Sequence, residues 1–189
     1  MQQQYIAKTL QGLENVLAKE LETLGAKDVE VLKRAVSFSG DKAMLYAANI
    51  YLRTAIKILQ PLTTFRADDV QELYDQILAF NWSEVMDVDD TFTIDNTVFS
   101  TTFTHSNYAA LKMKDALVDH FRNKFGRRPD VNKLDPTYRF NIRIKENEVS
   151  IALDSSGESL HKRGYRTETH AAPMSEVQAA GLILLSGWD

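Results

Sequence analysis

Cysteine is absent from this chain of 189 residues, which excludes disulfides, thiolate nucleophiles and cysteine-ligated metals. That absence fits a reducing compartment. No apolar run approaches the roughly 18 residues that a membrane-spanning helix needs. The polar start, MQQQY, lacks the basic and apolar regions of a signal peptide. We therefore expect a cytoplasmic protein with no membrane contact.

Metal-ligating and catalytic patterns are also missing. The four histidines, His105, His120, His161 and His170, have no histidine partner at i, i+4 and no cysteine nearby, so no metal site is predicted. Adjacent acids such as Asp89-Asp90 point apart on a turn or strand end, which disfavours shared acid-base work. The sequence thus predicts no catalytic residue here.

A basic excess is absent overall, because the formal net charge is -4. The charges are nevertheless segregated. Residues 67–95 contain nine acids and no base, whereas residues 112–145 contain ten bases and four acids. Such segregation indicates one surface suited to a polyanion and another kept away from it.

Residues 138–154 read as a hairpin. Tyr138, Phe140, Ile142 and Ile144 alternate with polar residues, which is the period of a half-buried strand. With a two-residue turn at Glu146-Asn147, the register pairs Ile144 with Val149, Ile142 with Ile151 and Phe140 with Leu153. The outer face then carries Arg139, Arg143 and Lys145, with Arg139 opposite Asp154.

The segment after the hairpin, Leu160 to Arg166, has little apolar content to bury. Its cations, imidazole and phenol suit a loop that holds phosphate and stacks on a base. The alternative is a solvated basic linker. The residues of this segment predicted to bind RNA are His161, Lys162, Arg163, Tyr165 and Arg166.

A long helix is predicted from Asn107 to about Phe125, ended by Gly126. Its expected buried stripe is Tyr108, Leu111, Val118, Phe121 and Phe125. Lys124, Arg127 and Arg128 then form a cationic cluster at the negative end of the helix dipole. We expect this cluster, the outer face of the hairpin and the 160–166 segment to share one positive RNA-binding surface.

The first sixty residues show the order β-α-β-β-α-β of a ferredoxin-like unit, with strands at 5–9, 29–33, 35–39 and 55–59. The pattern restarts after Pro61, with a helix capped by Asp68-Asp69 and a strand at 91–98. A final helix, 173–185, becomes almost wholly apolar from Ala179. A helix apolar nearly all round must be buried on more than one side. We therefore expect the chain to be cut from a longer one, leaving this helix exposed or self-associating.

Three stretches carry a family resemblance: LDSSGESLHKRGYR, AAPMSEVQAAGLILLSGW and, less specifically, GLENVLAKELETLGA. Across essentially the whole chain they resemble the N-terminal region of bacterial large-subunit rRNA guanine-N2 methyltransferases, sometimes labelled N6-adenine-specific DNA methylases. The resemblance implies an α+β fold: a ferredoxin-like subdomain over residues 1–65, a THUMP RNA-binding domain over 66–166, and a linker with a C-terminal helix over 167–189.

The family's catalytic domain is Rossmann-like, binds S-adenosylmethionine on a glycine-rich turn and holds the base with an Asn/Asp-Pro-Pro-aromatic motif. Neither motif occurs here, since there is no G-x-G-x-x-G and all four prolines are isolated. The resemblance therefore implies that S-adenosylmethionine and catalysis belong to a domain beyond Asp189, acting on guanine N2 of 23S rRNA. Its expected partners are structured RNA and that missing methyltransferase domain.

Two alternatives remain open. The chain could be a non-catalytic ferredoxin-like protein-interaction or regulatory module, or the THUMP module of another RNA- or DNA-modifying enzyme. RNA binding would weaken steeply with salt, whereas a protein contact that does not depend on Arg127 and Arg128 would tolerate salt and their neutralisation.

Overall fold

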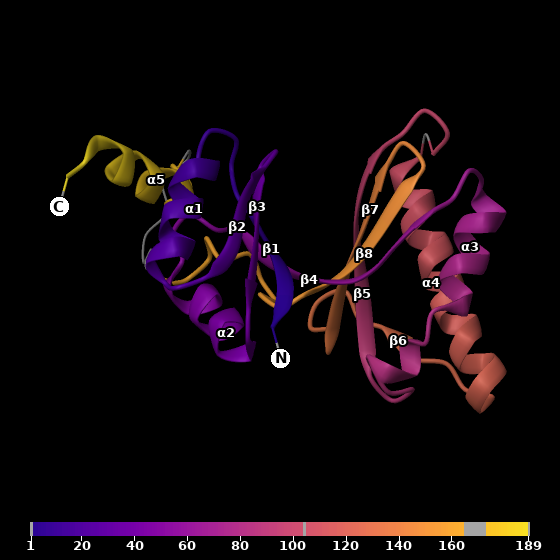
Figure 1. Cartoon of the computed structure of the whole chain (residues 1–189). Coiled ribbons are helices and arrows are strands. Elements are labelled where there is room, and N and C mark those ends of the chain that lie inside the picture. Colours follow the sequence, from indigo (N-terminus) through magenta and orange to yellow (C-terminus); the bar gives the residue numbers. More distant parts are fainter. Residues whose placement is uncertain (1, 104, 165–172, 189) are drawn as a thin grey trace. The chain divides into compact units, whose positions relative to one another are not determined.

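The computed structural model describes residues 2–103, 105–164 and 173–188. The chain forms two compact units, one of residues 1–60 together with 155–189 and the other of residues 61–154 (Figure 1). In the described part of the chain, no helix combines the length and apolar character that crossing a bilayer requires.

The first unit has the predicted ferredoxin-like order. Its sheet runs β2-β3-β1-β4, and the pairs β1–β3, β1–β4 and β2–β3 are antiparallel. Helices α1 and α2 cover one face (Figure 1), where Leu17, Leu21 and Ala48 pack against Val36 and Phe38. The elements are β1 (Gln3–Lys8), α1 (Glu14–Thr23), β2 (Lys27–Leu32), β3 (Ala35–Gly40), α2 (Lys42–Tyr51) and β4 (Lys57–Arg66).

Strand β4 is longer than predicted, because it continues through Pro61 to Arg66. Proline lacks a backbone N–H and is excluded from a strand only where that N–H is needed by the ladder. The pairing of β1 with β4 covers only residues 57–59, so Pro61 removes no hydrogen bond to β1.

The second unit is built on a mixed sheet, which confirms the α+β class. Strand β5 is parallel to both β6 and β7, and β7 is antiparallel to β8. Asp69 caps α3 as expected, because its side chain accepts a hydrogen bond from the Glu72 N–H at 2.8 Å. The elements are α3 (Val70–Ala79), the 3-10 helix η1 (Trp82–Glu84), β5 (Thr91–Phe99), α4 (Ser106–Phe125), β6 (Asp130–Val131), β7 (Tyr138–Lys145) and β8 (Glu148–Asp154).

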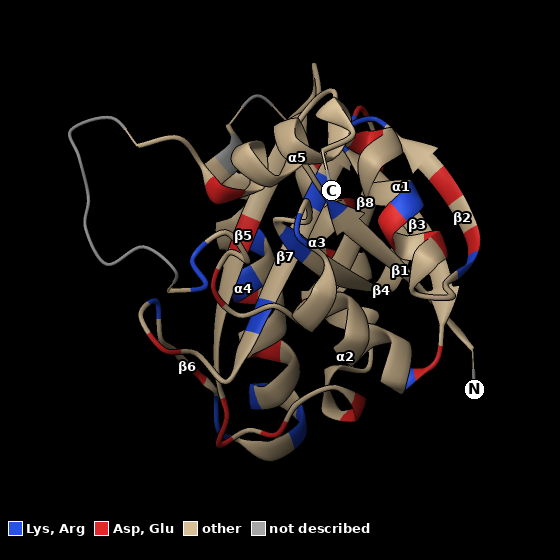
Figure 2. Ribbon diagram, turned by 90° about the vertical axis from the view of Figure 1, so that its left-hand side faces the viewer, with Lys and Arg blue, Asp and Glu red and all other residues tan. Residues whose placement is uncertain are grey.

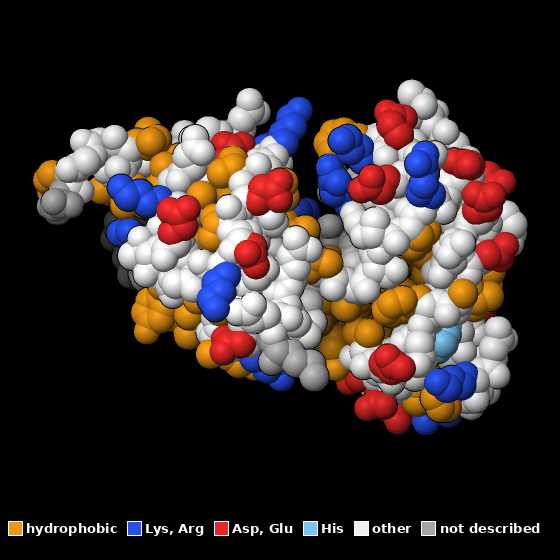
Figure 3. Space-filling view, viewed as in Figure 1, with side chains coloured by type: hydrophobic (Ala, Val, Ile, Leu, Met, Phe, Trp, Pro, Cys, Tyr) orange, Lys and Arg blue, Asp and Glu red, His pale blue; other side chains and the backbone are white. Residues whose placement is uncertain are grey.

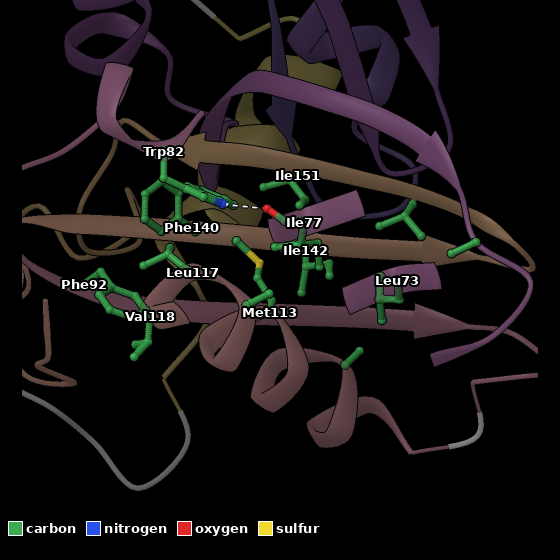
Figure 4. Packing of buried hydrophobic residues seen from close by; sticks show 14 of the residues in the cluster. Leu73, Ile77, Trp82, Phe92, Met113, Leu117, Val118, Phe140, Ile142 and Ile151 are labelled. Carbon is green, nitrogen blue, oxygen red and sulfur yellow. Dashed lines mark hydrogen bonds between the residues drawn. The ribbon is translucent and has the colours of Figure 1, made fainter. Parts of the chain in front are cut away.

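Helices α3 and α4 lie on one face of this sheet, and the core of the unit is between them and the strands (Figures 1 and 4). Trp82 is fully buried there. Its indole Nε1 donates to the Ile77 carbonyl at 2.8 Å, and its ring meets those of Phe80 and Phe140 edge-on. The opposite face of the sheet therefore carries mostly polar residues of β5, β7 and β8.

The buried stripe predicted for α4 was wrong at three positions. Tyr108, Leu111 and Phe125 are 45%, 53% and 49% exposed, although Val118 and Phe121 are buried as expected. The stripe that faces the core contains small residues, which let the helix approach its neighbours closely. Its members are Ala109, Met113, Ala116, Leu117, Val118 and Phe121.

Residues 155–164 fold back onto the first unit. The Ser155 N–H donates to the Ile58 carbonyl at 2.9 Å, and the Ile58 N–H donates to the Ser156 hydroxyl at 2.8 Å. Leu160 packs against the core of the first unit. This differs from the predicted domain boundary at residue 166, because composition indicated a turn here but not which backbone its hydroxyls would bind.

The last helix, α5 (Glu176–Ser186), packs on the first unit through a narrow face. Val177 and Gly181 are buried, and a Cβ on Gly181 would lie 2.5 Å from the Leu13 methyl carbons, so a larger residue there would have to displace the Leu13 side chain. Several large apolar side chains of the helix stay exposed: Leu182 (50%), Ile183 (45%) and Leu185 (60%), followed by Trp188 (73%).

Candidate nucleic-acid interface

The hairpin of β7 and β8 has the predicted register. Ile144 pairs with Val149, Ile142 with Ile151 and Phe140 with Leu153, and these residues belong to the core of the unit. Because side chains alternate along a strand, Arg139, Asn141, Arg143 and Lys145 face away from the helices. Figure 2 colours lysine and arginine blue, and several such positions fall along β7. This face of the sheet thus presents basic side chains.

The register across three strands arranges this outer face in rows. Thr97, Arg143 and Ser150 form one row, and Phe99, Lys145 and Glu148 form the next. Arg143 and Lys145 are exposed, whereas Arg139 is half-buried. Within the described residues, the buried Nε of Arg139 has no hydrogen-bond partner. Guanidinium donors on a polar sheet face are suited to anionic oxygens.

The turn of the hairpin is held in place by the start of the same unit. Glu146 has a positive φ of 53°, and the Ala67 N–H donates to the Asn147 carbonyl at 2.9 Å. The Asn147 side chain donates to Asp68 Oδ1 at 2.7 Å and accepts from Arg66 at 3.1 Å. The end of β7 that carries Arg143 and Lys145 is therefore a rigid platform.

The cationic cluster at the end of α4 lies on the helix side of the sheet, not on the face of Arg143. Gly126 ends the helix with φ 67°, as predicted. Lys124 donates from Nζ to the side-chain Oδ1 of Asn81 at 3.5 Å, Arg127 forms an ion pair with Asp89, and Arg128 lines a separate hollow. The single positive surface predicted from adjacency in sequence is therefore not formed, since helix and strand occupy opposite layers.

Family models match both units of the chain. The RlmL ferredoxin-like domain matches residues 4–59, and the THUMP domain matches residues 67–154. The chain is an RlmL-type ferredoxin-like domain joined to a THUMP domain. This confirms the resemblance found in the sequence.

Solved structures with the same arrangement are methylase-like proteins of about twice the length. One is a predicted N6-adenine-specific DNA methylase from Listeria monocytogenes, 29% identical with a TM-score of 0.86, covering 100% of this chain and 49% of that one. Another is SMU.472, described as a methyltransferase and solved with SAH, 29% identical with a TM-score of 0.84, covering 99% and 49%. The chain spans about half the length of each.

A third structure is similar in fold alone. It is a 4-thiouridine synthetase solved in complex with RNA and ATP, 12% identical with a TM-score of 0.53, and the match covers 82% of this chain and 41% of that one.

A hollow of ≈ 740 Å³ opens on the helix side of the THUMP domain. Its charges largely pair with each other: Lys114 with Asp115 at 2.7 Å and Arg122 with Asp119 at 3.2 Å. The Tyr74 hydroxyl donates to Asp119 at 2.8 Å. That hydrogen bond, with burial and nearby acids, raises the pKa of Tyr74 to about 12. The lining bases are Lys112, Lys114, Arg122 and Arg128, and the acids are Asp115, Asp119 and Asp130.

The basic segment after the hairpin belongs to the ferredoxin-like domain. Arg163 donates from Nε to the Leu160 carbonyl at 2.9 Å and from its two terminal nitrogens to the carbonyls of Ile50 and Leu52, at 2.6 and 2.7 Å. It thus binds the carbonyl end of α2. His161 contacts the Ser159 hydroxyl at 2.7 Å, and Lys162 is exposed. The predicted Tyr165 and Arg166 lie outside the described residues.

Among residues 2–103, 105–164 and 173–188, no three histidine or acidic side chains converge to hold a metal ion.

One exposed residue of the THUMP sheet was not predicted from the sequence. Phe99 is 64% exposed and pairs with Lys145 on the basic face. Extending the alternation of β5 by one residue beyond Val98 would have found it.

Proposed function

We propose that this chain is the RNA-binding region of an S-adenosylmethionine-dependent methyltransferase whose target is guanine N2 of 23S rRNA. Support comes from the THUMP domain, from relatives named as methylases, and from the relative solved with SAH, which is S-adenosylmethionine without its methyl group. The catalytic domain, which binds the cofactor, follows in the whole protein, and the protein acts in the cytoplasm.

The basic face of β7 carries this proposal. Arg143 and Lys145 are exposed side chains on a rigid strand, and they bind phosphate oxygens of structured RNA. Arg139 is half-buried on the same face and adds its positive charge near this contact. Further phosphate contacts come from two other groups, Lys124, Arg127 and Arg128 at the end of α4, and His161, Lys162, Arg163, Tyr165 and Arg166 after the hairpin. Arg163 contributes least, because its nitrogens already bind carbonyls.

Salt-dependent binding of a structured RNA tests the proposal. The double variant Arg143→Glu/Lys145→Glu should lower affinity and reduce the slope of log K against log salt by roughly 0.7 to 0.9 for each lost phosphate contact. Lys133→Glu, an exposed base in a loop of the same domain, is the matched control. Equal affinities of the double variant and the control at low salt would refute the assignment of this face.

The second basic group is tested in the same assay. Arg127→Glu/Arg128→Glu should weaken binding less than the β7 variant, because Arg127 already pairs with Asp89. A DNA duplex of the same sequence distinguishes an RNA-modifying enzyme from the DNA methylase for which one relative is named. Preference for DNA would contradict an rRNA target.

The exposed side of α5 supports a second partner, the catalytic domain of the same protein. In the isolated chain this side promotes self-association, because burying three such side chains is worth on the order of 5 kcal/mol. Sedimentation of the wild-type chain beside Leu182→Glu and Leu185→Glu measures the effect. A wild-type chain that stays monomeric at millimolar concentration, with α5 protected from hydrogen exchange, would contradict it.

A further inference from the structure

Phe99 is an exposed apolar residue on the outer, mostly polar face of the THUMP sheet. The other outward positions of β5 are Thr91, Thr93, Asp95 and Thr97, all polar, whereas Phe99 ends the strand with 64% of its surface exposed. Hydrophobic and basic side chains lie together at the upper edge of the second unit in Figure 3. The fold does not need this ring for its core, because the neighbouring Val98 packs against the core from the other face.

The backbone beneath the ring is fixed from two sides. The Glu146 N–H donates to the Phe99 carbonyl at 2.7 Å. The Glu146 carboxylate in turn accepts from the N–H and the hydroxyl of Thr101, at 3.3 and 3.2 Å. Phe99 is thereby held between the loop that follows β5 and the turn of the hairpin. An exposed aromatic ring on a fixed backbone loses little conformational entropy when a planar ligand stacks on it.

Two cations of β7 lie on one side of the ring, at the spacing of the sheet. Lys145 is its direct neighbour on β7, about 4.8 Å away between strands, and Arg143 is one row further, about 6.6 Å along the strand. Glu148 closes the same row on the far side of Lys145. The Glu148 carboxylate repels phosphates at this end of the row. The row therefore favours contact with a single nucleotide over contact with the backbone of a duplex.

We propose that Phe99 stacks on an unpaired base of the bound RNA while Lys145 and Arg143 hold the adjoining phosphates. The inference rests on the proposed RNA-binding function and deepens it: the THUMP face selects structured RNA that presents an unstacked nucleotide in a loop, bulge or end. Aromatic rings flanked by cations hold single-stranded nucleic acid because every base has a face that stacks.

Binding of two labelled RNAs to the 189-residue chain tests this inference. One RNA is a single strand of about twelve nucleotides, within the length that single-strand sites span. The other is the same strand paired in a blunt duplex. Phe99→Ala should weaken binding of the single strand roughly 5- to 150-fold and leave the duplex nearly unchanged. Phe99→Trp should keep or increase single-strand affinity, whereas Phe99→Leu should lose it.

Phe125→Ala is the matched control, because Phe125 is a similarly exposed ring in the same domain but at the end of α4. An unchanged thermal midpoint establishes that each variant is folded. Single-strand affinity that survives Phe99→Ala, or that Phe99→Leu preserves, refutes the stacking, and the latter outcome makes Phe99 a general apolar contact with the RNA. A wild-type chain that binds neither RNA refutes the RNA-binding function itself.

Discussion

Replacing Trp82 by phenylalanine should destabilise the THUMP domain without unfolding it. Trp82 is fully buried, and the substitution removes the hydrogen bond from its Nε1 to the Ile77 carbonyl, worth about 1 kcal/mol. That carbonyl keeps a longer bond from the Phe80 N–H, at 3.3 Å, so it is not left without a donor. The larger cost is therefore expected from packing.

The packing loss comes from two ring contacts and a cavity. The indole lies 4.8 Å from the Phe80 ring and 5.3 Å from the Phe140 ring, both edge-on, and such pairs contribute about 0.5–1.5 kcal/mol each beyond their buried area. Phenylalanine keeps part of both contacts and leaves a space where the pyrrole ring was. Together with the hydrogen bond, we expect a loss of about 2–4 kcal/mol in the free energy of unfolding.

Hydrogen exchange of the β7–β8 hairpin is the appropriate assay, because the chain has two units and a single unfolding transition cannot be assumed. A loss of about 2–4 kcal/mol should speed exchange of its protected amides roughly 30- to 700-fold if they exchange by opening of the whole domain. Trp188→Phe is the control, since Trp188 is 73% exposed. A Trp82→Phe change of less than about 0.5 kcal/mol, equal to the control, would refute the view that this ring organises the core.

Three further predictions concern hydrogen bonds in the two domains. Burial raises the pKa of Glu14, but hydrogen bonds from the backbone N–H groups of Arg34 and Gly12 outweigh it, so the pKa lies below its ordinary value. The stabilisation by Glu14 is present above the unfolded pKa of about 4.3 and is lost as the pH falls through the folded pKa. On acidification, the thermal midpoint of the ferredoxin-like domain should therefore fall more in the wild type than in Glu14→Gln. Parallel curves would contradict this. Asp119→Asn should lower the pKa of Tyr74 from about 12 toward its ordinary value near 10. The pKa is measured from the phenolate absorbance, with Tyr74→Phe identifying the contribution of Tyr74. An unchanged titration would argue against the hydrogen bond. Arg163→Gln should cost about 1–3 kcal/mol and speed exchange of the Leu160 amide, which donates to Ile56 at 2.8 Å, whereas Lys162→Gln should have no such effect.

Local patterns were sufficient for much of the fold. The β-α-β-β-α-β order, the cap at Asp69 and the end of α4 at Gly126 depend on neighbours within a few residues, and the structure has them as predicted. The hairpin register followed from the same kind of information, because a two-residue turn and strict alternation permit one pairing that buries Phe140, Ile142 and Ile144 together.

Which side of a helix is buried was not decided by local pattern. The apolar pattern of α4 predicts burial of its large residues, but the structure buries Ala109 and Ala116 and exposes Tyr108 and Leu111. A helix with apolar residues on several sides has no unique inner face until its neighbours are placed. Here α3 and the sheet select the side on which small residues permit close approach.

In the candidate site, too, some features were predicted from the sequence and others depend on the tertiary structure. The amino-acid sequence by itself determined that Arg139, Arg143 and Lys145 share one face, because alternation along a strand is a local property. Only the tertiary structure decided that the bases at the end of α4 lie in the opposite layer, that Arg163 binds the end of α2, and that Phe99 joins the basic face. Each of these depends on contacts between residues distant in sequence, and composition carries no information about which distant backbone a side chain will meet.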